Sequence, residues 1–270
     1  MGQTTSTAEA TSTATATLEH IYPFLTSYKA TEALASAEGV DGYEALCRRN
    51  LPNRQARAAY NYMSNGMNEE GIRQYQALLS TYWARLPPPL KALPANVVLL
   101  MPSADGGMPH TRPNHLICVP GRATALPYET FCHELWHIHQ RAHYDTWTTF
   151  FNKSWSFHIY KGSIPDTLRD VLRINPDTMA DPLWIWRDTW VPLCVFLNPV
   201  SPRLDQTAVW FYNVRTQRHR QDPPPEMAAF FGTDIPAVAY EHPCELAAYS
   251  ATSTSESPGH TALLKHFLMS

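Results

Sequence analysis

The chain has 270 residues, with 21 Lys and Arg against 24 Asp and Glu, and its formal net charge is -3. This length allows one elaborated domain or two lobes with a full core. The small net charge gives no electrostatic reason to expect a nucleic acid partner. No apolar run reaches the ~18–20 residues that a membrane-spanning helix requires. We therefore expect neither a nucleic acid partner nor a transmembrane segment.

Five cysteines, an odd number, are spread along the chain without a Cys-x-x-Cys pair. This spacing argues against a zinc site built from cysteines. No secretory signal is visible ahead of them, which favours reduced thiols. We expect an intracellular, cytoplasmic protein.

Residues 1–17 are mostly Thr, Ser and Ala. They offer too little apolar surface to offset the entropy of ordering, so we predict a flexible leader. The first six residues match the N-myristoylation pattern, with Gly2 as the acceptor. No basic residue occurs before Lys29, and one acyl chain without a second signal binds membranes weakly. Two alternatives therefore stand for this segment: weak membrane association through an acylated Gly2, or an unmodified tail.

Residues 18–95 are predicted to form a helical N-terminal lobe. Asp41 is expected to cap a short helix, and Asn68 to cap a longer one over residues 69–86. The three prolines at 87–89 end this longer helix, because proline cannot continue it.

Residues 96–270 are predicted to form an α+β catalytic domain. Two buried strands precede a helix over residues 127–142, whose proline at the start favours helix initiation. Aromatic and β-branched segments further on predict a small antiparallel sheet. The predicted strands cover residues 96–101, 114–119, 183–187, 190–197 and 207–214.

The helix predicted over residues 127–142 contains the motif His133-Glu134-Leu135-Trp136-His137. Histidines four residues apart lie on one helix face, ~6 Å apart along the axis, so both imidazoles can bind one ion. Catalytic zinc takes three protein ligands and leaves one position for water. Glu134 lies beside this position, where a carboxylate can take a proton from the activated water. The motif therefore predicts Zn2+ and hydrolysis of a peptide bond, with Glu134 as general base.

Two residues compete as the third ligand. His143 has the spacing of the metzincin motif HExxHxxGxxH, but Gln140 stands where that motif turns the chain at a glycine. A helix that continues through this position carries His143 too far along the axis to reach the ion. Glu245, in a downstream helix opened by a proline, matches the arrangement of gluzincins, and we favour it. Glu241 precedes that proline and is a lesser candidate.

These segments together resemble a family. Residues 115–120, 133–141, 173–177 and 241–245 are similar to gluzincin-type zinc metallopeptidases encoded by large DNA viruses and some unicellular eukaryotes. The likeness covers residues 96–255, and EHPxE after HExxHxxQR is its most specific part. It implies a zincin-like core, zinc held by His133, His137 and Glu245, and Glu134 as base. It implies no substrate beyond a peptide or protein.

Three further residues are candidates for roles around the ion. Tyr240 and His242 are predicted to donate a hydrogen bond to the developing oxyanion. Tyr249, one turn after Glu245, either orients a ligand or belongs to the core.

A different class of function competes with the peptidase. A zincin-fold protein with little or no turnover, serving as a structural or interaction component such as a virion protein, would hold the same metal. Glu134 separates the two, because only the enzyme needs a base there.

Overall fold

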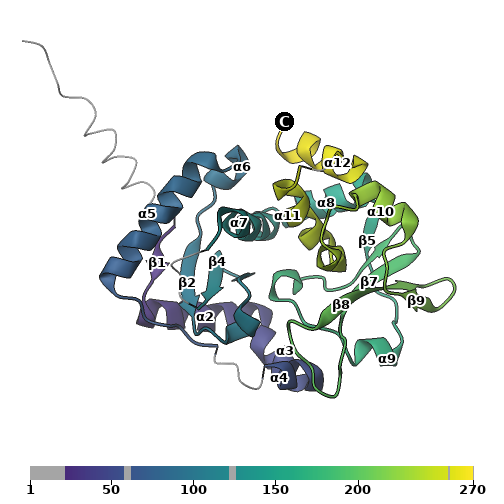
Figure 1. The fold of residues 1–270 in the computed structure, drawn as a ribbon, viewed down its shortest axis with the longest axis horizontal. Coiled ribbons are helices and arrows are strands. Elements are labelled where there is room, and N and C mark those ends of the chain that lie inside the picture. The colour runs from purple at the N-terminus through teal and green to yellow at the C-terminus, as the bar shows by residue number, and fades with distance from the viewer. Residues whose placement is uncertain (1–21, 58–61, 122–125, 255, 270) are drawn as a thin grey trace, which may run out of the picture.

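The computed structural model describes residues 22–57, 62–121, 126–254 and 256–269. Within these ranges the chain is a mixed α+β protein with eleven α-helices, a four-stranded mixed sheet and a five-stranded antiparallel sheet (Figure 1). The predicted leader, residues 1–17 with Gly2, lies outside the described residues. In the described ranges, no helix combines the length and the apolar character needed to cross a membrane.

The helices lie in three groups along the chain. Those before the first long strand are α2 (Ser27–Asp41), α3 (Tyr43–Arg49), α4 (Leu51–Ala56), α5 (Glu69–Arg85) and α6 (Pro88–Lys91). The central ones are α7 (Tyr128–Ala142), α8 (Tyr144–Ser154) and α9 (Asp166–Arg169). The last ones are α10 (Pro225–Phe231), α11 (Pro243–Thr252) and α12 (Pro258–Phe267).

The strands form two sheets. The first has the order β1-β2-β4-β3 and consists of β1 (Phe24–Leu25), β2 (Asn96–Leu100), β3 (His110–Arg112) and β4 (Leu116–Pro120). The second has the order β5-β6-β7-β8-β9 and consists of β5 (Phe157–Ile159), β6 (Trp184–Trp186), β7 (Trp190–Phe196), β8 (Thr207–Asn213) and β9 (Arg218–Arg220).

Helices cover both faces of the first sheet. Strands β1, β2 and β4 are parallel, and β3 is the antiparallel edge strand. Along β2, Val97 and Leu99 join the core that contains α7, whereas Val98 and Leu100 join a second core with α2. Side chains alternate between the two faces of a strand, so a strand that is buried on both faces must be apolar throughout.

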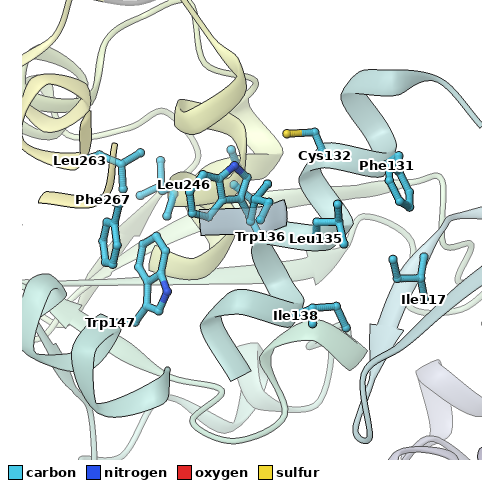
Figure 2. Packing of buried hydrophobic residues seen from close by; sticks show 14 of the residues in the cluster. Ile117, Phe131, Cys132, Leu135, Trp136, Ile138, Trp147, Leu246, Leu263 and Phe267 are labelled. Carbon is cyan, nitrogen blue, oxygen red and sulfur yellow. The ribbon is translucent and has the colours of Figure 1, made fainter. Parts of the chain in front are cut away.

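Helix α7 is fixed by apolar contacts on two of its sides. Phe131, Leu135 and Ile138 pack towards Ile117 of the first sheet, with the i, i+4, i+7 spacing of one helix face (Figure 2). Trp136 lies on the opposite side with Leu246 of α11 in the same core. His133, Glu134 and His137 of the motif are not part of this apolar core.

The second sheet and the last helices form the other half of the molecule (Figure 1). Strands β7 and β8 pair along seven residues. One face of this sheet contributes Trp186 and Phe211 to the core of α7, and the other is covered by Leu168 of α9. The predicted small antiparallel sheet is therefore confirmed.

Local signals account for several element boundaries. Asn68 caps α5, because its Oδ1 accepts a hydrogen bond from the Gly71 N–H at 2.8 Å. The strand predicted over residues 114–119 begins too early, since β4 starts at Leu116. Asn114 and His115 have φ values of 63° and 59°, which form the turn that joins β3 to β4.

Two short strands of the first sheet were not predicted. β1 has two residues and depends on parallel pairing of Phe24 with Val97. β3 consists of three polar residues, His110, Thr111 and Arg112, all buried. Tertiary pairing, rather than local pattern, creates both strands.

The packing of α7 gives a stability prediction. Leu135 is completely buried, so Leu135→Ala leaves a cavity and should lower the free energy of unfolding by about 2–4 kcal/mol. Val200→Ala is the control, because Val200 is 87% exposed. Urea denaturation followed by circular dichroism measures both, and equal stability of the two variants contradicts the packing described for this helix.

Candidate metal centre

Three buried or half-buried side chains converge between α7 and α11. His133 and His137 come from consecutive turns of α7, and Glu245 comes from the first turn of α11. The two Nε2 atoms are 3.0 Å apart, and Glu245 Oε2 lies 3.3 Å and 3.6 Å from them. These residues form a group that could hold a metal ion.

The spacing of the three atoms suits a tetrahedral ion. Zinc lies ~2.0–2.1 Å from nitrogen or oxygen ligands, which places tetrahedral ligands about 3.3–3.4 Å from one another. The observed separations of 3.0, 3.3 and 3.6 Å surround this value. Two imidazoles and one carboxylate leave a fourth tetrahedral position for another ligand.

The start of α11 explains why Glu245 points at the imidazoles. His242 caps the helix, because its Nδ1 accepts a hydrogen bond from the Cys244 N–H at 3.1 Å. Pro243 occupies the first helical position, where its missing N–H leaves no helical hydrogen bond unmade. Glu245 then lies in the first turn, and the helix dipole favours a carboxylate there.

A hydrogen-bond relay joins α7 to α11. Gln140 Oε1 lies 2.8 Å from His137 Nδ1. Gln140 Nε2 donates a hydrogen bond to the Cys244 carbonyl at 2.9 Å. An Oε1 acceptor requires the proton on Nδ1, which leaves Nε2 available as a ligand. Gln140 thereby fixes the imidazole and holds the turn that carries Glu245.

A second support comes from the segment before Pro176. Asn175 Nδ2 donates to Glu245 Oε1 at 2.8 Å and to Glu241 Oε1 at 2.5 Å. The Arg173 guanidinium contacts both Glu241 oxygens, at 2.7 and 2.8 Å. Glu241 is thus committed to Arg173 and Asn175 and is not part of the metal-binding group.

The charges at the site stabilise one another. Burial alone raises the pKa of Glu245, but His137 and His133 hold it well below its usual value. Burial alone lowers the pKa of His137, whereas Glu245 raises it to about 10. Imidazole binds a metal in its neutral form, so metal binding must release the proton that Glu245 stabilises on His137.

Glu134 is the buried acid beside this group. Its Oε2 has no hydrogen-bond partner. Burial, followed by the nearby charge of Asp177, raises its pKa to about 7, although the two motif histidines act in the opposite direction. A carboxyl group that titrates near neutral pH is suited to general acid–base chemistry.

His143 does not join the group. The His143 N–H donates to the His139 carbonyl at 2.9 Å, so α7 continues through Gln140 as its helix propensity predicts. The His143 ring packs on the His139 ring, 4.4 Å between centroids. The described residues therefore bring Glu245, not His143, to the two motif histidines.

Tyr240 and His242 are engaged elsewhere. The Tyr240 hydroxyl donates to the Gly232 carbonyl at 2.7 Å. The His242 ring lies between the Cys244 N–H and the Asp181 carbonyl, and burial lowers its pKa to about 4. Neither is among the described residues that line the cavity at the metal-binding group. Their roles as oxyanion donors remain predictions.

A cavity of about 540 Å3 opens onto His133, Glu134 and Glu245. Tyr249 is the tyrosine among its described lining residues, and its ring packs against His133 with centroids 4.6 Å apart. Burial and then Glu245 raise the pKa of Tyr249 to about 12, so its hydroxyl keeps its proton. Tyr249 is therefore a hydrogen-bond donor at the cavity.

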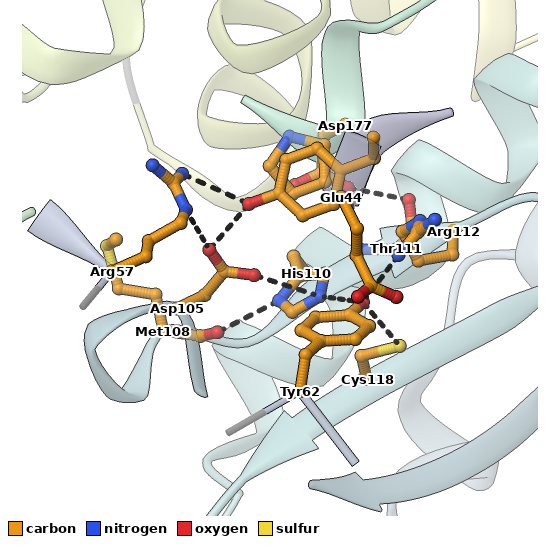
Figure 3. A network of polar contacts seen from close by, with 12 residues as sticks. Glu44, Arg57, Tyr62, Asp105, Met108, His110, Thr111, Arg112, Cys118 and Asp177 are labelled. Carbon is orange, nitrogen blue, oxygen red and sulfur yellow. Dashed lines mark hydrogen bonds and ion pairs between the residues drawn. The ribbon is translucent and has the colours of Figure 1, made fainter. Parts of the chain in front are cut away.

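The opposite wall of the cavity comes from the N-terminal half of the chain. Asp105 lies between Arg57 and His110, with its Oδ1 3.0 Å from Arg57 Nε (Figure 3). Burial alone lowers the pKa of His110, but Asp105 raises it to about 10. These buried charges compensate one another, and all three residues line the cavity.

Sequence reasoning did not assign the supporting roles of Gln140 and Asn175. Gln140 lies three residues after His137, a spacing at which helix side chains meet, and this signal was available. Asn175 lies within residues 173–177 of the family resemblance, but no local spacing links it to Glu245, which is 70 positions away.

The third ligand gives a test by metal analysis. Glu245→Gln removes the negative charge from the group and should weaken zinc binding by at least about 100-fold, whereas His143→Ala should bind zinc as the unmodified protein does. Competition with a chromophoric chelator measures both affinities. Zinc retained by the first variant and lost by the second contradicts the geometry described here.

The raised pKa of Glu134 predicts a pH-dependent stability. The folded state binds the proton of the Glu134 carboxyl group more tightly than the unfolded state does. Protonation of Glu134 therefore stabilises the folded state fully below the ordinary pKa of 4.5, and this stabilisation is lost as pH rises through about 7. Glu134→Gln cannot ionise. In metal-free protein, its stability relative to the unmodified chain should rise between pH 5 and pH 8 by on the order of 2 kcal/mol.

Thermal unfolding in the presence of a chelator, at both pH values, measures this difference. Glu129→Gln is the control, because Glu129 lines the same cavity but is not buried. A Glu134→Gln effect that is the same at both pH values rules out a perturbed carboxyl group.

Comparison with known proteins adds no assignment: no family model, no curated protein and no solved structure matches the chain. The functional feature that the structure establishes is the His133, His137 and Glu245 group, which could hold a metal ion.

Proposed function

We propose that this protein is a zinc-dependent peptidase of the gluzincin type. The observation that carries the proposal is the convergence of three ligand atoms from α7 and α11, with Glu134 in the cavity that His133 and Glu245 also line. Two imidazoles and one carboxylate form a ligand set used by zinc hydrolases.

The roles of the residues in the resembling segments support the gluzincin assignment. His242 and Pro243 begin α11, and Glu245 projects from its first turn. Asn175 and Gln140 provide the hydrogen bonds that a metal site needs around its ligands. The pattern that resembles the family is thus the pattern that builds this site.

In the proposed mechanism, His133, His137 and Glu245 would hold zinc, which would supply a Lewis acid for the amide carbonyl and for water. Glu134 accepts a proton from the attacking water and transfers it to the departing amine nitrogen. Burial raises the pKa of Glu134 above its ordinary value, which favours a carboxylate that can both take and return this proton. Tyr249 donates a hydrogen bond to the carbonyl oxygen as negative charge develops on it.

The alternative function is that of a structural or interaction protein with little or no catalytic activity. Both proteins would bind zinc, so metal content does not distinguish them. Four further points remain predictions: the domain boundary between residues 95 and 96, the intracellular location, the lack of a nucleic acid partner, and acylation of Gly2.

Replacement of Glu134 tests the enzyme directly. Glu134→Gln preserves the shape of the side chain but cannot accept the proton, so hydrolysis in a mixed peptide library should fall by at least about 1,000-fold while zinc content stays unchanged. Mass spectrometry of the cleaved peptides measures the loss.

Glu129→Gln serves as the matched control, because it changes an acid of the same cavity that lies outside the metal-binding group. It should retain activity. Equal and negligible hydrolysis by the unmodified protein and by Glu134→Gln, with zinc bound to both, supports the structural role instead.

A further inference from the structure

The edge of the first sheet borders the cavity at the metal-binding group. Met108, Pro109 and His110 line it, and β3 is the edge strand. An exposed edge strand commonly recognises a peptide by adding it as a further strand, through main-chain hydrogen bonds. Whether β3 offers free N–H and C=O groups therefore decides how a substrate binds.

Thr111 is the residue of β3 that turns its backbone outward. In an antiparallel ladder, alternate residues bond to the neighbouring strand, and the residues between them face away from it. The Thr111 N–H donates to Asp177 Oδ1 at 2.7 Å, and the Thr111 carbonyl accepts from Arg141 at 3.3 Å. Both outward groups of Thr111 are thus occupied by the protein itself.

The residues before Thr111 offer no N–H either. The Met108 N–H donates to the Asp105 carbonyl at 3.2 Å, and Pro109 has no N–H. His110 pairs with Cys118 of β4. Within the described part of the chain, this edge leaves no main-chain donor for a peptide.

The segment that covers the edge, residues 172–178, is anchored at several points. We call it the strap. The buried Asn53 side chain donates to the Leu172 carbonyl at 2.6 Å and accepts from the Ile174 N–H at 2.9 Å. The Arg141 guanidinium donates to the Pro176 carbonyl at 2.6 Å.

The strap also holds the metal-binding group. Asn175 donates to Glu245 at 2.8 Å, so removal of the strap from β3 would release a ligand. The strap is thus a fixed wall and not a lid, because displacement would disturb the site that a substrate must reach.

We infer that the substrates are short peptides, recognised inside the cavity, and not extended polypeptide segments paired to β3. This inference rests on the proposed peptidase function and names its substrate class. The cavity of about 540 Å3 lies within the ~300–1,000 Å3 typical of small-molecule sites. A long substrate gains no main-chain pairing at Thr111 to offset the entropy of ordering its additional residues.

A nested peptide series tests the inference. A bond cleaved by the unmodified protein but not by Glu134→Gln is placed at the centre of peptides of about four, eight and twelve residues. The value of kcat/KM should be highest for the shortest peptide and at least about tenfold lower for the longest.

A variant that uncovers the edge sharpens the test. Asp177→Ala frees the Thr111 N–H, and the ratio of kcat/KM for long over short peptides should rise about tenfold. Asp177→Asn keeps an acceptor oxygen and should leave the ratio unchanged. Asp205→Ala is the matched control, because it changes a cavity-lining acid whose salt bridge is to Arg203, away from β3.

Amide hydrogen exchange at Thr111 checks the contact without any catalysis. The Thr111 amide should be protected in the unmodified protein and in Asp177→Asn, and should exchange faster in Asp177→Ala. Rapid exchange in the unmodified protein overturns the inference.

The outcomes separate this inference from the function on which it rests. Glu134-dependent hydrolysis that favours the longest peptides refutes the short-peptide class and leaves the peptidase standing. No Glu134-dependent hydrolysis at any length refutes both. If Asp177→Ala fails to fold, the length series on the unmodified protein still decides.

Discussion

A carboxylate removed from water is unfavourable unless charges and hydrogen bonds surround it, and Glu245 is such a group. Its Oε2 lies between two imidazoles, and its Oε1 accepts from Asn175. The same surroundings that stabilise the anion place it where three ligand atoms meet. The packing of α7 against α11, and the support of both by the strap, serve to hold this one carboxylate in place.

Supports from three distant segments meet at Glu245. Gln140 and Cys244, which join α7 to α11, are separated by 104 positions in the chain. Asn53, in the N-terminal half, bonds to the strap that carries Asn175. Buried hydrogen bonds are directional, so they fix one arrangement where apolar packing alone would tolerate several. The site is thus specified by a polar network inside an apolar frame.

Asp177 links access to the cavity with the acid–base chemistry proposed for it. Its carboxylate covers the outward N–H of Thr111, and its charge helps to raise the pKa of Glu134. Glu134 also keeps one buried oxygen without a partner. Native proteins rarely leave such a group unsatisfied, and those that do are often found at functional sites. Through Asp177, the strap therefore both blocks the edge of β3 and adds negative charge near Glu134.

The sequence by itself determined the parts of this protein that depend on local periodicity and chemistry. Asn68 predicted the start of α5, apolar runs predicted β2 and β7, and the spacing of His133 and His137 predicted one shared ion. Only the tertiary structure decided that Glu245 joins them and His143 does not, because that choice depends on how α11 packs on α7. Sequence analysis did not predict the edge strand β3 or the contact of residues 172–178 with it. The residues of β3 are polar, and the contact of Thr111 with Asp177 spans 66 positions. Local patterns carry no information about contacts over such a distance.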